Sequence, residues 1–211
     1  MQTDIITVSN NGEGAEDALN ESTRFSNYVG LDEKQALRIR LLAEEMIGMV
    51  KAISGEFTGK FWIENTSDKV CQLHLVASTD MNADKKKEFI NSSSNKKNAA
   101  STGVMGKIRE LFENSLFSIN DMADLQTEFG AAPVLYGSMG LMDVETSVMN
   151  SCIYQWSLEK YRHSVEETKD SNEGSTKAWD ELERSIVASI ADDVKVGVKG
   201  NEVELVIEKK Y

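Results

Sequence analysis

Hydrophobic and polar positions follow a helical period most clearly in residues 31–53. Asp32 is suited to cap the start of this helix, because its side chain can accept a hydrogen bond from an amide of the first turn. Glu45 falls at the edge of the apolar stripe, one turn before Met49, and Glu44 falls on the opposite side. The apolar residues recur three and four positions apart, as on one face of an α-helix: Ile39, Leu42, Ala43, Met46, Met49, Val50 and Ile53.

The period changes from helical to two-fold after Gly59, and this predicts β-strands. Residues 60–65 and 69–77 read as two strands joined by a short polar turn, which is a hairpin. In the second strand, Cys71, Leu73, Leu75 and Ala77 alternate with Val70, Gln72, His74 and Val76. A second hairpin is predicted near the C-terminus, around Lys199-Gly200-Asn201.

The rest of the pattern predicts a strand at 4–9, helices at 15–29, 103–116 and 177–190, a strand at 151–161, a connector at 163–176 and loops at 78–102 and 129–142. Helices and hairpins are segregated, without a regular alternation of strand and crossover helix. This order predicts an α+β fold, a two-layer sandwich with a mixed, largely antiparallel sheet covered by helices on one face. We interpret residues 1–211 as a single domain, with 162–211 as a C-terminal elaboration of it.

Charge and composition narrow the function classes. The chain has 35 acidic and 23 basic residues, a net charge of −12, which argues against direct binding of nucleic acid. Cys71 and Cys152 lack metal-type spacing and indicate free thiols rather than a disulfide framework. No leader opens the chain, and no apolar run reaches the ~18 residues of a membrane span. These features predict a soluble, cytoplasmic protein with no membrane contact.

Common catalytic and metal motifs are missing from the sequence. His74 and His163 have no Cys, Asp or Glu companions at the spacing of zinc ligands. The stretch 101–107 has the wrong glycine spacing for a phosphate-binding P-loop. The lysine-containing stretch 78–102 has the composition of an exposed loop rather than of a binding surface. Taken alone, Glu45 would be a solvated carboxylate at a helix rim.

The first 77 residues resemble the start of a histidine-kinase-like ATPase domain of the anti-sigma-factor type. Val29-Gly30-Leu31 matches the turn that ends the first helix of that family. Glu44-Glu45 matches the carboxylates of its N-box, and the hairpin at 60–77 falls where the family's hairpin does. The resemblance implies a nucleotide-binding fold, and it lies in the pattern and order of elements rather than in one distinctive motif.

The resemblance also implies which residues would form the site. Glu45 would orient water or a substrate hydroxyl for phosphoryl transfer from ATP, and Met49 stands where the family has an Asn that holds Mg²⁺. A thioether is a poor ligand for Mg²⁺, which prefers oxygen. Ala77 stands where the family has an Asp that reads adenine, and Asp80 follows three residues later as a substitute if the loop were rebuilt.

A glycine loop is the third part of the implied site. Gly137 and Gly140, in Gly137-Ser138-Met139-Gly140-Leu141, match the loop that leads into a helix and offers backbone amides to phosphate. Gly103-Val104-Met105-Gly106 is the weaker match to the same loop. By composition alone, these glycines would be ordinary turn residues.

We therefore predict a regulatory or protein-binding protein on a degenerate histidine-kinase-like ATPase fold, without ordinary Mg-ATP turnover. Its partner would be a protein of the sigma-factor or anti-sigma-antagonist kind in bacterial signal transduction, and a homodimer is left open. The alternative is an active, ATP-binding protein serine/threonine kinase that uses Glu45 as its base. A third interpretation is a protein that binds a different small ligand in the equivalent pocket.

Overall fold

A computed structural model of the chain describes residues 1–54, 56–67, 69–79, 106–108, 154–168, 173–199 and 202–211. The helices and strands are, in chain order, β1 (Ile6–Ser9), α1 (Ala15–Val29), α2 (Glu33–Ser54), β2 (Phe57–Ser67), β3 (Val70–Thr79), β4 (Tyr154–Ser157), α6 (Leu158–Thr168), α7 (Glu173–Arg184), α8 (Ile186–Ile190), β5 (Asp193–Lys199) and β6 (Glu202–Lys210). Residues 106–108 add one helical turn, whereas most of the predicted helix at 103–116 lies outside the described residues.

The described strands form one six-stranded sheet in the order β1-β2-β3-β6-β5-β4, and all pairings among them are antiparallel. Strands β2 and β3 form the first predicted hairpin, and β5 and β6 form the second. Strand β3 pairs with β6 from Val70–Lys210 to Ser78–Glu202, which joins the two ends of the chain into one sheet. The predicted α+β fold, with helices packed against a largely antiparallel sheet, is confirmed.

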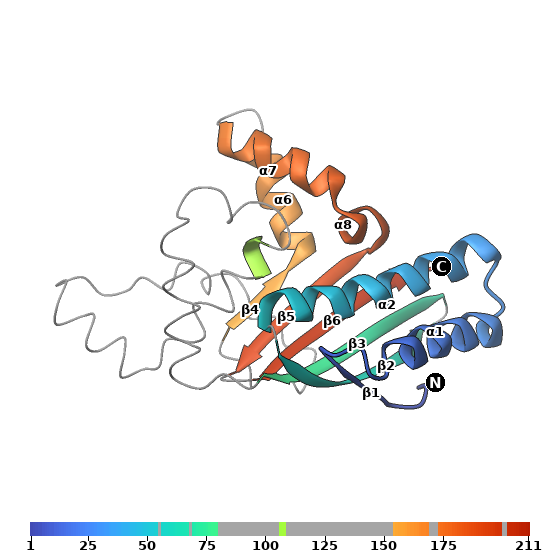
Figure 1. Cartoon of the computed structure of the whole chain (residues 1–211). Coiled ribbons are helices and arrows are strands. Elements are labelled where there is room, and N and C mark those ends of the chain that lie inside the picture. The colour runs from blue at the N-terminus through green and yellow to red at the C-terminus, as the bar shows by residue number, and fades with distance from the viewer. Residues whose placement is uncertain (55, 68, 80–105, 109–153, 169–172, 200–201) are drawn as a thin grey trace.

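Helices α1 and α2 lie next to each other on one face of the sheet (Figure 1). Helix α2 crosses over β2, β3 and β6, and its 22 residues give it a length of about 33 Å. The backbone N–H of Gln35 donates to Oδ1 of Asp32 at 2.8 Å, so the predicted N-terminal cap is confirmed.

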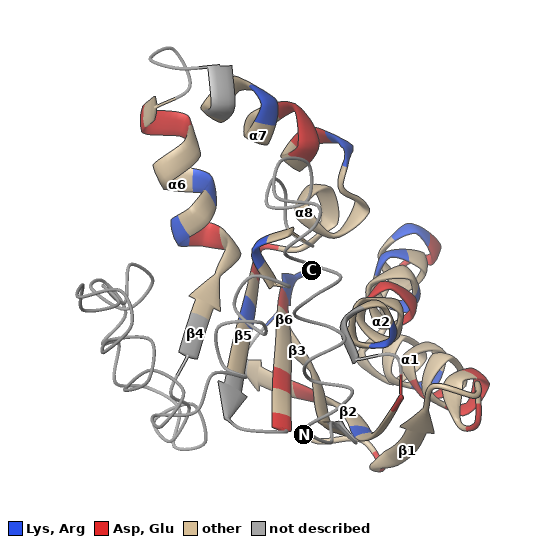
Figure 2. Ribbon diagram, turned by 60° about the vertical axis from the view of Figure 1, so that its left-hand side comes forward, with Lys and Arg blue, Asp and Glu red and all other residues tan. Residues whose placement is uncertain are grey.

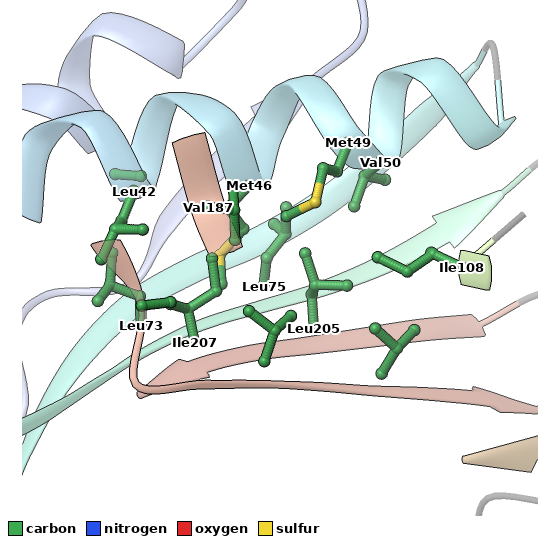
Figure 3. Packing of buried hydrophobic residues seen from close by; sticks show 14 of the residues in the cluster. Leu42, Met46, Met49, Val50, Leu73, Leu75, Ile108, Val187, Leu205 and Ile207 are labelled. Atoms are coloured by element: carbon green, nitrogen blue, oxygen red, sulfur yellow. The ribbon is translucent and has the colours of Figure 1, made fainter. Parts of the chain in front are cut away.

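The core lies between α2 and the strand residues that face it (Figure 3). The predicted alternation is confirmed, because the apolar set of each hairpin strand is fully buried: Phe61, Ile63, Cys71, Leu73, Leu75, Ala77, Leu205 and Ile207. Burial raises the pKa of the Cys71 thiol to about 12, so this thiol stays protonated and poorly reactive at neutral pH.

The predicted strand at 151–161 is wrong in its C-terminal part. Strand β4 ends at Ser157 and α6 begins at the next residue. The cause is Asp193, a buried residue of β5, whose Oδ1 accepts hydrogen bonds from the Ser157 hydroxyl at 3.1 Å and from the Glu159 amide at 3.0 Å. Because this carboxylate satisfies an amide of the first helical turn, it stabilises a helix start. The predicted connector at 163–176 is therefore helical as far as Thr168.

The predicted single helix at 177–190 is two helices. Helix α7 begins earlier than expected, at Glu173, and α8 follows after a break at Ser185. The Ser185 hydroxyl accepts a hydrogen bond from the Ala188 amide at 3.2 Å and so caps the start of α8. The chain changes direction at the break, so α8 contacts α2, whereas α6 and α7 extend away from the sheet (Figure 1).

Candidate functional site

Glu45 lies in the middle of α2, at the margin of its buried face. Its side chain is half-buried, whereas that of Glu44 is exposed. Arg40 identifies the flank of α2 that faces α1, because its guanidinium binds the Glu16 carboxylate of α1 at 3.3 Å. Five residues turn an α-helix by about 140°, so Glu45 lies on the flank that faces away from α1.

Helix α8 and the turn at 106–108 pack near the buried face of α2. Helix α8 contacts α2, and Val187 of α8 belongs to the same buried cluster as Met46 (Figure 3). Ile108 is 1% exposed and lies near Val50, close to the C-terminal end of α2 (Figure 3). A carboxylate at this margin has apolar neighbours on the core side and retains access to solvent, which suits a proton acceptor or a hydrogen-bond acceptor.

Met49 does not line an open site. Its side chain is 4% exposed and is directed from α2 toward the sheet, where Leu75 also lies (Figure 3). The thioether therefore fills space in the core. Mg²⁺ takes oxygen ligands, and α2 offers no oxygen ligand one turn after Glu45. The residues present do not fit the magnesium site that the family resemblance implies.

Three of the residues implied by the resemblance, Asp80, Gly137 and Gly140, lie outside the described residues. Their placement relative to Glu45 therefore stays a prediction. Ala77 is described: it is fully buried in β3, on the strand face that α2 covers. Gly106 of the weaker glycine loop is also described, and it is buried at the start of the helical turn at 106–108.

A second group of polar side chains lies on the far face of the sheet, the side opposite α2, and no grouping of these residues was predicted from the sequence. Trp62 and His74 are cross-strand partners, with ring centroids 4.8 Å apart and ring planes 3° from parallel. The Trp62 indole N–H donates to Oε1 of Glu64 at 2.9 Å, and Oε2 of Glu64 lies 4.0 Å from Nε2 of His74. The two-fold period of the hairpin contained this signal, because it places all three side chains on one face.

The His74 imidazole should be neutral at pH 7. Burial lowers its pKa below the ordinary 6.5, and the Glu64 charge raises it in part. We expect the His74 ring resonance to titrate below pH 6.5 in NMR spectra, and Glu64→Gln to lower the midpoint further. The chain has two histidines, so the variant His163→Gln leaves a single histidine signal, which belongs to His74. The folded state favours the neutral imidazole over the charged one. The free energy of unfolding is therefore highest above pH 6.5, and this contribution is lost as the pH falls through the folded-state pKa. A midpoint above 6.5, or one that Glu64→Gln raises, would contradict this assignment.

In the described part of the chain, no three side chains of His, Cys, Asp and Glu come close enough to hold a metal ion. No helix there combines the length and the apolar character needed to cross a bilayer.

Comparisons with known proteins give no family for this chain. Models of known protein families, curated protein sequences and solved structures all failed to produce a match.

Proposed function

We propose that this is a regulatory protein that acts by binding other proteins, on a histidine-kinase-like ATPase fold without ordinary Mg-ATP turnover. The observation that supports it is the burial of Met49, which is 4% exposed at the position where the family has its metal-binding Asn. Phosphoryl transfer depends on positioning and on neutralising charge, and a metal ion usually supplies much of that neutralisation. A core thioether cannot hold such an ion.

The arrangement of the N-terminal half supports the family assignment within this proposal. A capped helix carries the paired glutamates, and a β-hairpin follows it, in the order that the resemblance implies. Glu45 lies on the flank of α2 that is free of α1, where a ligand or a partner would reach it. The partner class that follows from the resemblance is a sigma factor or an antagonist of an anti-sigma factor.

The second candidate function is an active protein serine/threonine kinase that uses Glu45 as its base. The half-buried position of Glu45 favours it, because a carboxylate at the margin of a core can serve as a proton acceptor. In that case Asp80, in a rearranged loop, would read adenine, the loop containing Gly137 and Gly140 would bind phosphate, and Mg²⁺-ATP would be the phosphate donor.

Thermal unfolding with ATP or ADP, each with and without Mg²⁺, separates the two functions. A ligand that binds only the folded state at 100 times its Kd stabilises it by about 2.7 kcal/mol, which is roughly 5–10 °C for a chain of this size. We expect Mg²⁺-ATP to raise the midpoint by less than about 1 °C. A large Mg²⁺-dependent shift would reject the proposed function.

Radiolabelled phosphate transfer to a candidate partner protein tests the kinase directly, and Glu44→Gln and Glu45→Gln are a matched pair for it. The two substitutions change the same charge on neighbouring residues, one exposed and one half-buried. The kinase requires transfer that Glu45→Gln removes and Glu44→Gln keeps. A regulatory protein binds its partner in both variants and transfers nothing.

A further inference from the structure

An asparagine followed by a glycine lies in the connection between β1 and α1. Asn11 and Gly12 are both exposed, and the pair occurs once in the sequence. The connection is at the edge of the sheet, where β1 is the outermost described strand and α1 lies beside it (Figure 2). Neither residue belongs to α2, so the pair is separate from the site that carries Glu45.

The side chain of Asn11 is held by two hydrogen bonds to its oxygen. The backbone N–H of Glu13 donates to Oδ1 of Asn11 at 3.0 Å, and the Ser9 hydroxyl donates to the same atom. An amide N–H can only donate, so the contact with Glu13 identifies which end of the side-chain amide is the oxygen. Both donors therefore point at the carbonyl end, and Nδ2 is the other end.

Backbone hydrogen bonds keep these donors in place. The Ser9 N–H donates to the Glu13 carbonyl at 3.1 Å, and the Gly12 N–H donates to the Ser9 carbonyl at 3.2 Å. Gly12 has no side chain, and a Cβ atom built on it would meet nothing within 4 Å. No side chain of this residue therefore stands between its backbone nitrogen and the neighbouring asparagine.

The two donors lie where negative charge develops if the side chain of Asn11 is attacked. When the Gly12 nitrogen attacks Cγ of Asn11, the electrons of the carbonyl bond move onto Oδ1. Donors that are already fixed at this oxygen stabilise that charge, as the donors of an oxyanion hole do. The reacting atoms belong to adjacent residues, so no second molecule has to be brought to the attacking group.

We propose that Asn11-Gly12 is a modification site at which the folded chain deamidates itself. The Gly12 nitrogen loses its proton to hydroxide and bonds to Cγ of Asn11, the bond from Cγ to Nδ2 breaks, and Nδ2 takes up a proton and leaves as ammonia. Water then hydrolyses the succinimide ring at either of its carbonyl carbons. The products are an aspartate or a β-aspartyl linkage at residue 11. Both add a negative charge, and the second also lengthens the backbone between β1 and α1.

Tandem mass spectrometry of the full chain, incubated at pH 8 either folded or unfolded in guanidinium chloride, tests the proposal. We expect the folded chain to gain about 1 Da at Asn11, at least as fast as the unfolded chain, because only the fold holds donors at Oδ1. Ser9→Ala should slow the folded chain about two- to tenfold and leave the unfolded chain unchanged, since one hydrogen bond to Oδ1 is lost. Ser9→Thr retains a hydroxyl and should keep the wild-type rate. Asn27, an exposed asparagine of α1 that precedes Tyr28, is the internal control and should stay unmodified.

Two results would overturn the proposal. One is a folded chain that reacts more slowly than the unfolded chain or not at all. The other is a folded Ser9→Ala variant that reacts as fast as the wild type or faster, which would mean that the Ser9 hydroxyl restrains Asn11 instead of stabilising charge on Oδ1. The comparison of folded and unfolded wild-type chain needs no substitution, so it decides the matter even if Ser9→Ala does not fold.

Discussion

Leu205→Ala should lower the free energy of unfolding by about 3–5 kcal/mol, in the upper part of the range for buried Leu→Ala substitutions. Leu205 is fully buried in β6 and pairs with Leu75 of β3 and Val196 of β5, in the middle of the face that α2 covers (Figure 3). The substitution removes apolar contact on all of these sides. Because α2 and the two flanking strands stay in place, they fill the space left by the leucine side chain only in part. The remaining cavity further lowers the free energy of unfolding.

Chemical denaturation followed by circular dichroism measures this change, and Leu37→Ala is the control. Leu37 is a leucine of α2 that is 56% exposed, and alanine is a good helix former, so its substitution should change the stability by less than about 0.5 kcal/mol. Equal effects of the two variants would mean that α2 does not cover β6 as the structure describes.

The central part of the fold could be predicted from the sequence because its signals are local. Residues 31–53 repeat their apolar positions with one helical period, and the observed α2 spans Glu33–Ser54. The hairpin alternates strictly, and its apolar set is the set that the core buries. In both segments a single face is apolar, so only one orientation removes that face from water.

The start of α6 could not be predicted in this way, because the group that stabilises it is distant in sequence. Ser157 and Glu159 are bound by Asp193, 36 and 34 residues further along the chain. The local pattern of 151–161 alternates and so favours a strand throughout. A tertiary cap overrides that preference, and no window of neighbouring residues contains the information.

The half-buried and buried glutamates divide along the same line. The half-buried position of Glu45 follows from the helical period, whereas the burial of Glu204 depends on the pairing of β6 with two strands that are distant in sequence, β3 and β5. In the sequence, Glu204 is one polar position in an alternating strand and has the pattern of a solvated face. Only the strand order shows that its strand is central in the sheet, and among the described residues its Oε2 has no hydrogen-bond partner.

Gly14→Ala should cost about 3–4 kcal/mol, for two separate reasons. The residue has φ of 72°, a left-handed conformation that costs an L-residue about 1–2 kcal/mol. A Cβ atom at this position would also lie 1.8 Å from the carbonyl oxygen of Thr7, so α1 would have to move away from β1. The close approach lets α1 begin directly beside β1 and then pack on α2.

Gly12→Ala separates the two contributions. Gly12 has φ of 91°, but a Cβ there would meet nothing within 4 Å, so only the conformational cost of about 1–2 kcal/mol applies. The difference between the two variants, measured by denaturation, is the cost of moving α1 relative to β1. If both variants lose the same stability, the contact of Gly14 with Thr7 is not a constraint on the fold, and the N-terminal end of α1 can shift without disturbing its packing on α2.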